Sequence, residues 1–147
     1  MKAIDDYTVI LRGRKFKKML DHLYEDMREK CGLRQIEIDI MMYLSQYPGD
    51  NASDISRNMY INKGHVSQAM NNLCVDGYLD AHVDENDRRY VSYDITAKGK
   101  ALIDETTLIK NSINKQLFQG ITKEERILFE KVTTVISNNL DHITISL

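Results

Sequence analysis

The chain has 147 residues, of which 42% are hydrophobic and 29% charged, and its formal net charge is −2 at pH 7. This is the composition of an ordinary globular protein, which excludes a disordered chain, and the length allows one core rather than two independent ones. No apolar run is long enough to cross a bilayer and the N-terminus lacks a signal-peptide pattern, so we expect a cytoplasmic protein without a membrane partner.

The first third of the chain predicts two helices. Apolar residues recur at one-turn spacing in the first, which ends at Gly32; they are Phe16, Met19, Leu20, Leu23, Tyr24 and Met27. A second helix, rich in Ile and Met, is predicted over residues 33–47. Pro48 and Gly49 then mark a turn.

A helix-turn-helix pattern follows. The segment ASDISRNMY predicts a short helix, Ile61-Asn62 a turn, and Lys63 to Val75 a second helix, with Asn62 as its N-cap. The apolar side of the second helix predicts a core-facing set, which is Val66, Met70, Leu73 and Cys74. The polar side predicts an outward set, which is Lys63, Ser67, Gln68, Asn71 and Asn72, with Gly64 and His65 at the helix start.

The outward side chains are suited to reading double-stranded DNA. Gln68 and Asn71 lie one turn apart, and an amide can pair with the N6 and N7 edge of adenine in the major groove. Ser67 can donate to a base or a phosphate, whereas Lys63 suits a phosphate at the positive end of the helix. Gly64 would let the backbone approach the DNA closely. For each residue the alternative is a solvated polar side chain, above all for Asn72.

Two alternating segments, LDAHV and YVSYDI, predict a hairpin whose charged tip runs from Asp84 to Arg89. Asp87 lies two residues before Arg89, so its carboxylate can hold the guanidinium in a fixed direction. An arginine held in this way, with Arg88 beside it, suits the negative potential of a narrow minor groove. The alternative is a solvated turn with an incidental ion pair.

The remaining chain predicts two long helices. Thr96 can cap the first, which ends near Gly120, and Thr122 with Glu125 matches a capping box for the second. Because long amphipathic helices flank the hairpin unit on both sides, we expect the chain ends to pack against a second copy. Such a two-fold dimer would present two reading units to half-sites about one helical turn apart. The alternative is that these helices only cover their own core.

The charge of residues 52–99 is acidic overall, with five basic side chains against seven acidic ones. A strong non-specific DNA binder would be basic there, so we expect weak non-specific affinity and a few cations placed at defined positions.

Taken together and in their order along the chain, these patterns in residues 11–105 resemble the MarR family of bacterial transcription regulators. The matching segments are Gly32-Leu33, the helix before Pro48, SDISRNMYINKGHVSQAMNNL, DGYLDAHVDENDRRYVSYDIT and Ala97-Lys98-Gly99. Asp87, Arg88 and Arg89 stand where the family has its wing motif. The resemblance implies a mainly α fold with a small antiparallel β-wing, in which residues 34–99 form a winged helix-turn-helix and residues 1–33 and 100–147 supply dimerisation helices.

The resemblance further implies an obligate dimer, a pseudo-palindromic operator and, often, relief of repression by a small aromatic or lipophilic ligand. We identify no ligand contacts from the sequence. One departure concerns Gln68, where many members have an arginine, and their reading units are usually more basic. This puts the operator sequence in doubt but not the fold.

Other function classes have less support. The four histidines are scattered, and GxSxG, HExxH and phosphate-loop motifs are absent, so we expect no enzyme. We also expect no cofactor and no metal, since there is no CxxC and no histidine pair four residues apart. A metal- or redox-sensing regulator, the latter through Cys31, and a winged-helix module for protein interaction remain as alternatives. Such a module would have an apolar outer helix face and no wing arginine.

Overall fold

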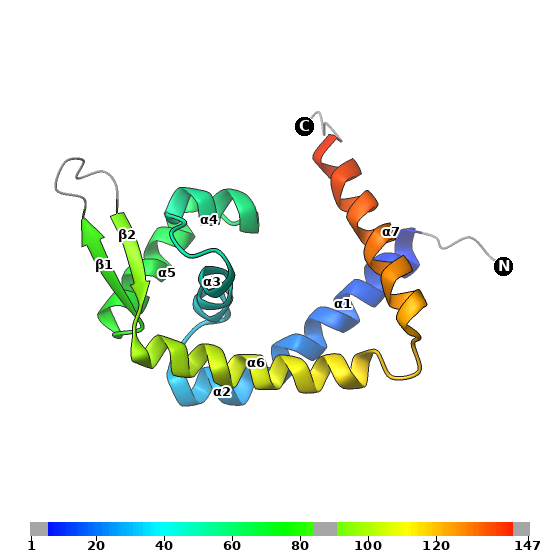
Figure 1. Cartoon of the computed structure of the whole chain (residues 1–147), viewed down its shortest axis with the longest axis horizontal. Coiled ribbons are helices and arrows are strands. Elements are labelled where there is room, and N and C mark those ends of the chain that lie inside the picture. Colours follow the sequence, from blue (N-terminus) through cyan, green and yellow to red (C-terminus); the bar gives the residue numbers. More distant parts are fainter. Residues whose placement is uncertain (1–5, 84–90, 143–147) are drawn as a thin grey trace. The chain divides into compact units, whose positions relative to one another are not determined.

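The computed structural model describes residues 6–83 and 91–142, in two compact units, one ending at Ile109 and the other beginning at Lys110. Figure 1 shows the order of the elements. They are α1 (Asp6–Leu23), α2 (Glu25–Cys31), α3 (Gln35–Gln46), α4 (Ala52–Met59), α5 (Lys63–Val75), β1 (Leu79–Val83), β2 (Val91–Ile95), α6 (Ala97–Leu117) and α7 (Lys123–His142). This is the predicted mainly α fold with a small antiparallel wing.

The sequence predicted one helix before Gly32, but the structure has two, interrupted at Tyr24. The amide of Arg28 still donates to the carbonyl of Tyr24, at 2.9 Å, and the guanidinium of Arg28 donates to the carbonyl of Asp21, at 2.7 Å. A side chain therefore satisfies a carbonyl at the end of α1. A break of one residue hardly disturbs the apolar spacing, and so periodicity could not reveal it. Gly32 ends α2 as predicted, in a left-handed conformation with φ 68°.

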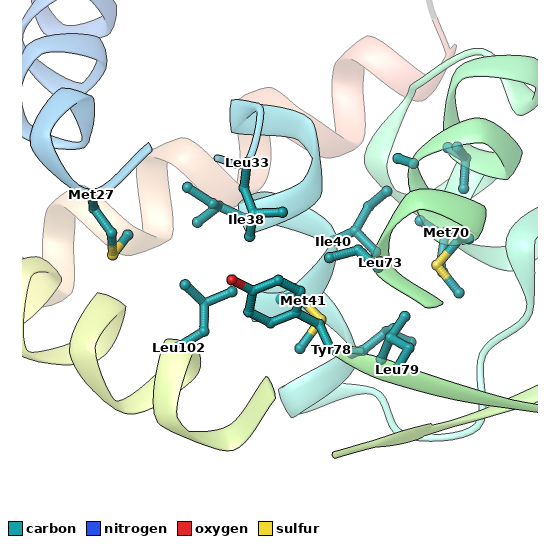
Figure 2. Close-up of a cluster of buried hydrophobic side chains, with 14 residues drawn as sticks. Met27, Leu33, Ile38, Ile40, Met41, Met70, Leu73, Tyr78, Leu79 and Leu102 are labelled. Carbon is teal, nitrogen blue, oxygen red and sulfur yellow. The ribbon is translucent and has the colours of Figure 1, made fainter. Parts of the chain in front are cut away.

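The core of the first unit forms where α3 and α5 pack together (Figure 2). Its members come from six elements and the loops beside them: Met27, Leu33, Ile38, Ile40, Met41, Leu44, Ile55, Val66, Ala69, Met70, Leu73, Tyr78, Leu79 and Leu102. Ile40, Met41, Ile55, Val66 and Leu73 have no measurable exposure. This packing determines which side of α5 faces outward.

The start of α6 is fixed against the hairpin. The hydroxyl of Thr96 accepts a hydrogen bond from the amide of Gly99, at 3.1 Å, and donates to the carbonyl of Gly77, at 2.7 Å. The cap predicted at Thr96 is therefore confirmed. A Cβ on Gly99 would collide with the carbonyl oxygen of Tyr78 and would lie 2.8 Å from side-chain atoms of both Ile95 and Met41. Only glycine allows α6 to pass this close.

The second unit begins within α6 and contains α7. Gly120 adopts φ 80°, and the amide of Thr122 donates to the carboxylate of Glu125, at 2.8 Å, while the amide of Glu125 donates to the Thr122 hydroxyl, at 3.2 Å. These bonds confirm the predicted capping box. Phe118 packs edge-on to Phe129 with ring centroids 6.4 Å apart. Within the described residues, no helix has the length and hydropathy needed to span a membrane.

Candidate nucleic-acid interface

Helix α5 begins and ends where the sequence predicts. The side chain of Asn62 accepts a hydrogen bond from the amide of Gly64, at 2.8 Å, which confirms the N-cap. Its inner side is buried through Val66, Met70 and Leu73, as predicted, and Cys74 is half-buried. A Cβ on Gly64 would lie 3.1 Å from the capping oxygen of Asn62, so a small residue at position 64 also protects the cap.

The outer side of α5 is polar as far as Asn71, and Val75 in its last turn is also exposed. Six of the predicted contact residues are exposed along it: Lys63, Gly64, His65, Ser67, Gln68 and Asn71. Gln68 and Asn71 have a spacing of three residues, so they share one face of the helix. The result is a row of neutral hydrogen-bond donors and acceptors with a single lysine at its N-terminal end.

Asn72 differs from the other outward residues. It is half-buried, and its side-chain amide donates to the carboxylate of Glu37 in α3, at 3.0 Å. Asn72 therefore connects two helices of the core and is not available as a contact on the outer face. Periodicity alone could not distinguish it from Asn71, because both are amides on the polar side of the helix.

Glu37 is a buried carboxylate, with 3% of its surface exposed. Arg34 donates to it three times, through its backbone amide at 2.7 Å, its Nε at 3.0 Å and its Nη2 at 2.7 Å. Burial by itself raises the pKa of Glu37, but the hydrogen bonds from Arg34 and Asn72 outweigh it and leave the pKa below its ordinary value. The ionised carboxylate thus fixes α5 against the start of α3.

The turn between α4 and α5 contains the one non-glycine residue with positive φ in the described chain, Tyr60, at φ 56° and ψ 38°. A left-handed conformation costs a residue with a Cβ about 1 kcal/mol, and glycine is the usual choice there. The phenol ring is 82% exposed. Sequence reasoning did not single out Tyr60, because this residue lies at the end of the short helix and outside any apolar periodicity.

A second feature that sequence reasoning missed is a polar cluster joining α3 to α4. The hydroxyl of Tyr43 donates to the carboxylate of Asp50, at 2.5 Å, and accepts from the side-chain amide of Asn58, at 2.7 Å. Burial and then the neighbouring Asp50 raise the pKa of Tyr43. The ring of Tyr47 lies 4.8 Å from that of Tyr43. This cluster holds α4 against α3 and so positions the turn that leads into α5.

The basic residues of this region divide into two groups. Arg57 pairs with Asp54, at 2.6 Å, and Lys98 donates to the carbonyl of Asp76, at 2.7 Å, while its ammonium lies 4.2 Å from the centre of the Tyr78 ring. Both cations therefore have partners within the chain. Of the described lysines and arginines in residues 52–99, Lys63 is the one without a hydrogen bond, ion pair or ring contact to another described side chain or carbonyl.

The hairpin has the predicted antiparallel pairing, in which Leu79 lies opposite Ile95 and Val83 opposite Val91. On its exposed side, His82 lies 3.1 Å from the carboxylate of Asp94. The tip, residues 84–90, lies outside the described residues, and with it the predicted contacts Asp87, Arg88 and Arg89. The structure thus describes the stem of the wing and not its tip.

One open groove of about 500 Å³ lies between the end of α3, strand β2 and the start of α6. Its lining residues are Leu44, Pro48, Gly49, Ser92, Tyr93, Asp94, Ile95 and Lys100. In the part of the chain that the structure describes, His, Cys, Asp and Glu side chains form no group of three that could hold a metal ion.

Comparison with known proteins agrees with this geometry. Residues 33–99 match the family described as winged helix DNA-binding domain. No curated protein matches the sequence. Among solved structures, a MarR protein from Peptoclostridium difficile has 18% identity over 97% of this chain and 92% of its own, with a TM-score of 0.82.

Two further structures carry information about ligands of those proteins. MepR of S. aureus was solved in complex with DNA; it has 18% identity over 92% of this chain and 96% of its own, with a TM-score of 0.76. BpsR of Bordetella bronchiseptica, whose DNA binding is regulated by 6-hydroxynicotinic acid, has 18% identity over 93% of this chain and 97% of its own, with a TM-score of 0.71. At these identities the likeness shows the fold.

Proposed function

We propose that this chain, which carries a winged helix DNA-binding domain and has the fold of the MarR regulators, is a sequence-specific transcription regulator. It binds double-stranded DNA as a homodimer, at a pseudo-palindromic operator, and acts in the cytoplasm as a repressor. Residues 34–99 form the reading unit, and residues 1–33 and 100–147 supply the helices that join the two copies.

The observation that carries this proposal is the outer face of α5. An α-helix fits the major groove, and bases are read there by side chains that both donate and accept hydrogen bonds. Gln68 and Asn71 provide two such amides on one face, and Ser67 adds a hydroxyl. Lys63 and the backbone at Gly64 and His65 contact DNA phosphates, next to the positive N-terminal end of the helix. A face for protein interaction would instead expose apolar side chains.

The wing supplies the second contact. β1 and β2 follow α5 along the chain and form an antiparallel stem, and we propose that the segment between them contacts DNA beside α5. At this tip, Arg89 enters the minor groove, Asp87 directs it, and Arg88 contacts the adjoining phosphates. These three roles rest on sequence pattern and on the position of the stem.

Exposed apolar side chains support the homodimer. Along α7, seven large hydrophobic residues are each 47–60% exposed: Ile127, Leu128, Phe129, Val132, Val135, Ile136 and Leu140. Leu11 and Phe16 of α1 are also more than 40% exposed. Isolated exposed hydrophobic residues are ordinary, but a whole helix face of them marks an association surface. A second copy of the chain is the occupant that two-fold symmetry favours.

A small aromatic or lipophilic effector completes the proposal. Its support is the fold shared with BpsR, whose DNA binding responds to 6-hydroxynicotinic acid. Such a molecule would release the operator by favouring a dimer geometry in which the two reading helices no longer match successive major grooves.

A fluorescence-anisotropy titration tests the proposed function. The probes are a duplex from the DNA upstream of the protein's own gene and a scrambled duplex of equal composition, each at two salt concentrations. Tight, salt-dependent binding to the native duplex alone supports a sequence-specific regulator. Equal and weak binding to both duplexes would contradict it.

A further inference from the structure

We propose that helix α1 carries a second DNA-contacting surface, its basic face, which consists of Arg14, Lys15, Lys17 and Lys18. This inference rests on the proposed function and adds to it phosphate contacts made outside the reading unit. The four cations neutralise backbone phosphates of the same duplex that α5 reads, whatever the base sequence of that duplex.

Positive charge is concentrated in the middle of α1. Residues 12–18 contain five of the 20 lysines and arginines and no acidic residue, whereas the rest of the chain has 15 basic residues against 22 acidic ones. All five cations are exposed: Arg12, Arg14, Lys15, Lys17 and Lys18. The chain is therefore strongly basic in this one segment and acidic outside it.

Helical geometry divides this part of α1 into two sides. Arg14 lies three residues from Lys17 and four from Lys18, and Lys15 lies three residues from Lys18, so these four side chains share one broad face. The opposite side is apolar and consists of Phe16, Met19, Leu20 and Leu23. A homodimer that covers the apolar side leaves the basic face open to solvent.

The chain itself does not neutralise the basic face. Among the residues that the structure describes, none of the four cations forms a hydrogen bond, an ion pair or a ring contact with another side chain. Like charges three and four residues apart repel one another along a helix. An external polyanion against this face would relieve the repulsion.

The reading unit lacks the charge that DNA binding requires. Residues 52–99 have five basic side chains against seven acidic ones, and Arg57 and Lys98 have partners within the chain. Affinity for DNA depends strongly on how many phosphates are neutralised by lysine and arginine. The basic face supplies four unpaired cations per protomer outside the unit that reads bases. Charge complementarity therefore favours DNA as the occupant of this face.

An anionic membrane surface is the competing occupant, because a basic amphipathic helix is also typical of proteins that lie on membranes. Such a helix inserts its apolar side between the lipids. In α1, however, Met19 and Leu20 on that side are already half-buried within the chain. This burial favours DNA phosphates over a membrane, and the experiment below includes both.

The salt dependence of DNA binding tests the inference. We would measure Kd of the full chain on the upstream duplex and the scrambled duplex across a series of salt concentrations. The test variant is R14Q/K15Q/K17Q/K18Q. The matched control is K110Q/K115Q/K123Q/K131Q, which removes the same charge from exposed lysines of α6 and α7. A charge-conserving variant, R14K/K15R/K17R/K18R, separates the role of charge from that of side-chain shape.

We expect the test variant to weaken binding to both duplexes alike, so that the ratio of the two affinities is unchanged. Each lost phosphate contact lowers the slope of log K against log salt by about one unit, so one contact per protomer lowers it by about two units in the dimer. The control and the charge-conserving variant should keep the wild-type slope. Circular dichroism should give the same Tm for all four proteins, since the changed side chains are exposed.

Several outcomes would overturn the inference. A wild-type slope for the test variant would show that the basic face does not contact DNA, and an equal fall for the control would assign the effect to total charge. If the wild type binds vesicles of phosphatidylcholine and phosphatidylserine while the test variant keeps the wild-type slope on DNA, the face binds membranes. Failure of the wild type to bind either duplex would instead contradict the proposed function, and this inference with it.

Discussion

At the scale of single residues, neighbouring asparagines on α5 have separate tasks. Asn71 faces solvent, whereas Asn72 donates to the buried carboxylate of Glu37. Three hydrogen bonds from Arg34 and one from Asn72 keep Glu37 ionised, although the residue is buried and only 3% of its surface is exposed. Helix α5 is therefore held against α3 through a polar contact as well as through the apolar core.

Replacing Asn72 should affect stability more than recognition. N72A leaves the Glu37 carboxylate with one donor fewer in a buried site, which costs about 1–3 kcal/mol in the free energy of unfolding. N71A, one position earlier and exposed, is the control and should change stability little. Urea denaturation monitored by circular dichroism measures both. Equal stability of the two variants would contradict the assigned role of Asn72.

Glu37 should also make stability depend on pH. Its pKa in the folded chain lies below the ordinary value of 4.5, so its stabilising effect is complete above that value and is lost as the pH falls through the lower, folded-state pKa. We expect the unfolding free energy of the wild type to fall more steeply below pH 4.5 than that of E37Q. Parallel curves for the two proteins would show that Glu37 does not titrate in this way.

Gln68 should determine which base pairs are preferred. Because an amide that pairs with adenine contributes discrimination of about 1–3 kcal/mol, Q68A should lose affinity for the operator far more than for scrambled DNA. Anisotropy titrations on both duplexes measure the ratio. Equal losses of affinity for the operator and for scrambled DNA would mean that Gln68 contacts only the sugar-phosphate backbone of the DNA.

At the scale of elements, the wing depends on how closely α6 approaches it. Thr96 and Gly99 bring the first turn of α6 against the carbonyls of Gly77 and Tyr78, which connect α5 to β1. Lys98 adds a hydrogen bond to the carbonyl of Asp76. The end of the reading helix, the wing stem and α6 therefore form one tightly packed junction.

A methyl group at this junction should be poorly tolerated. In G99A, the new Cβ would collide with a backbone carbonyl and two core side chains, so the hairpin or α6 must shift. Overpacking of this kind costs typically about 1–3 kcal/mol, which should lower Tm measurably. G13A is the control, since a Cβ at Gly13 meets no atom within 4 Å. An unchanged Tm for G99A would show that the junction can relax.

At the scale of the whole molecule, the two compact units have different kinds of surface. The first unit encloses a continuous core, whereas α7 in the second leaves large apolar residues from Ile127 to Leu140 about half exposed. An apolar face of this kind is the association surface that the proposed homodimer requires. Two-fold association would give a pseudo-palindromic operator two reading helices at once.

A charge on this helix should separate the copies. I136E places a carboxylate among the exposed apolar residues of α7, and a buried unpaired charge opposes association. S137E, on the polar side of the same helix, is the control. Analytical ultracentrifugation should give a monomer for I136E and a dimer for S137E. A dimer for I136E would place the association surface elsewhere.

The sequence by itself determined the local elements. The bounds of α5 and β1, the caps at Asn62 and Thr96, and the capping box at Thr122 all follow from short-range chemistry, in which a side chain satisfies backbone groups two or three residues away. The polar outer side of α5 follows from helical periodicity. The resemblance in the same residues indicated the winged-helix fold. The roles of Asp87, Arg88 and Arg89 stay predictions.

Tertiary structure alone decided the rest. The break at Tyr24, the burial of Asn72 against Glu37 and the cluster of Tyr43, Asp50 and Asn58 depend on groups brought together from different elements. The left-handed turn at Tyr60 depends on Met59 and Ile61 both packing inward. Periodicity records which side of a helix is polar, but only packing decides which polar residue on that side is used to hold the fold and which is left for a partner.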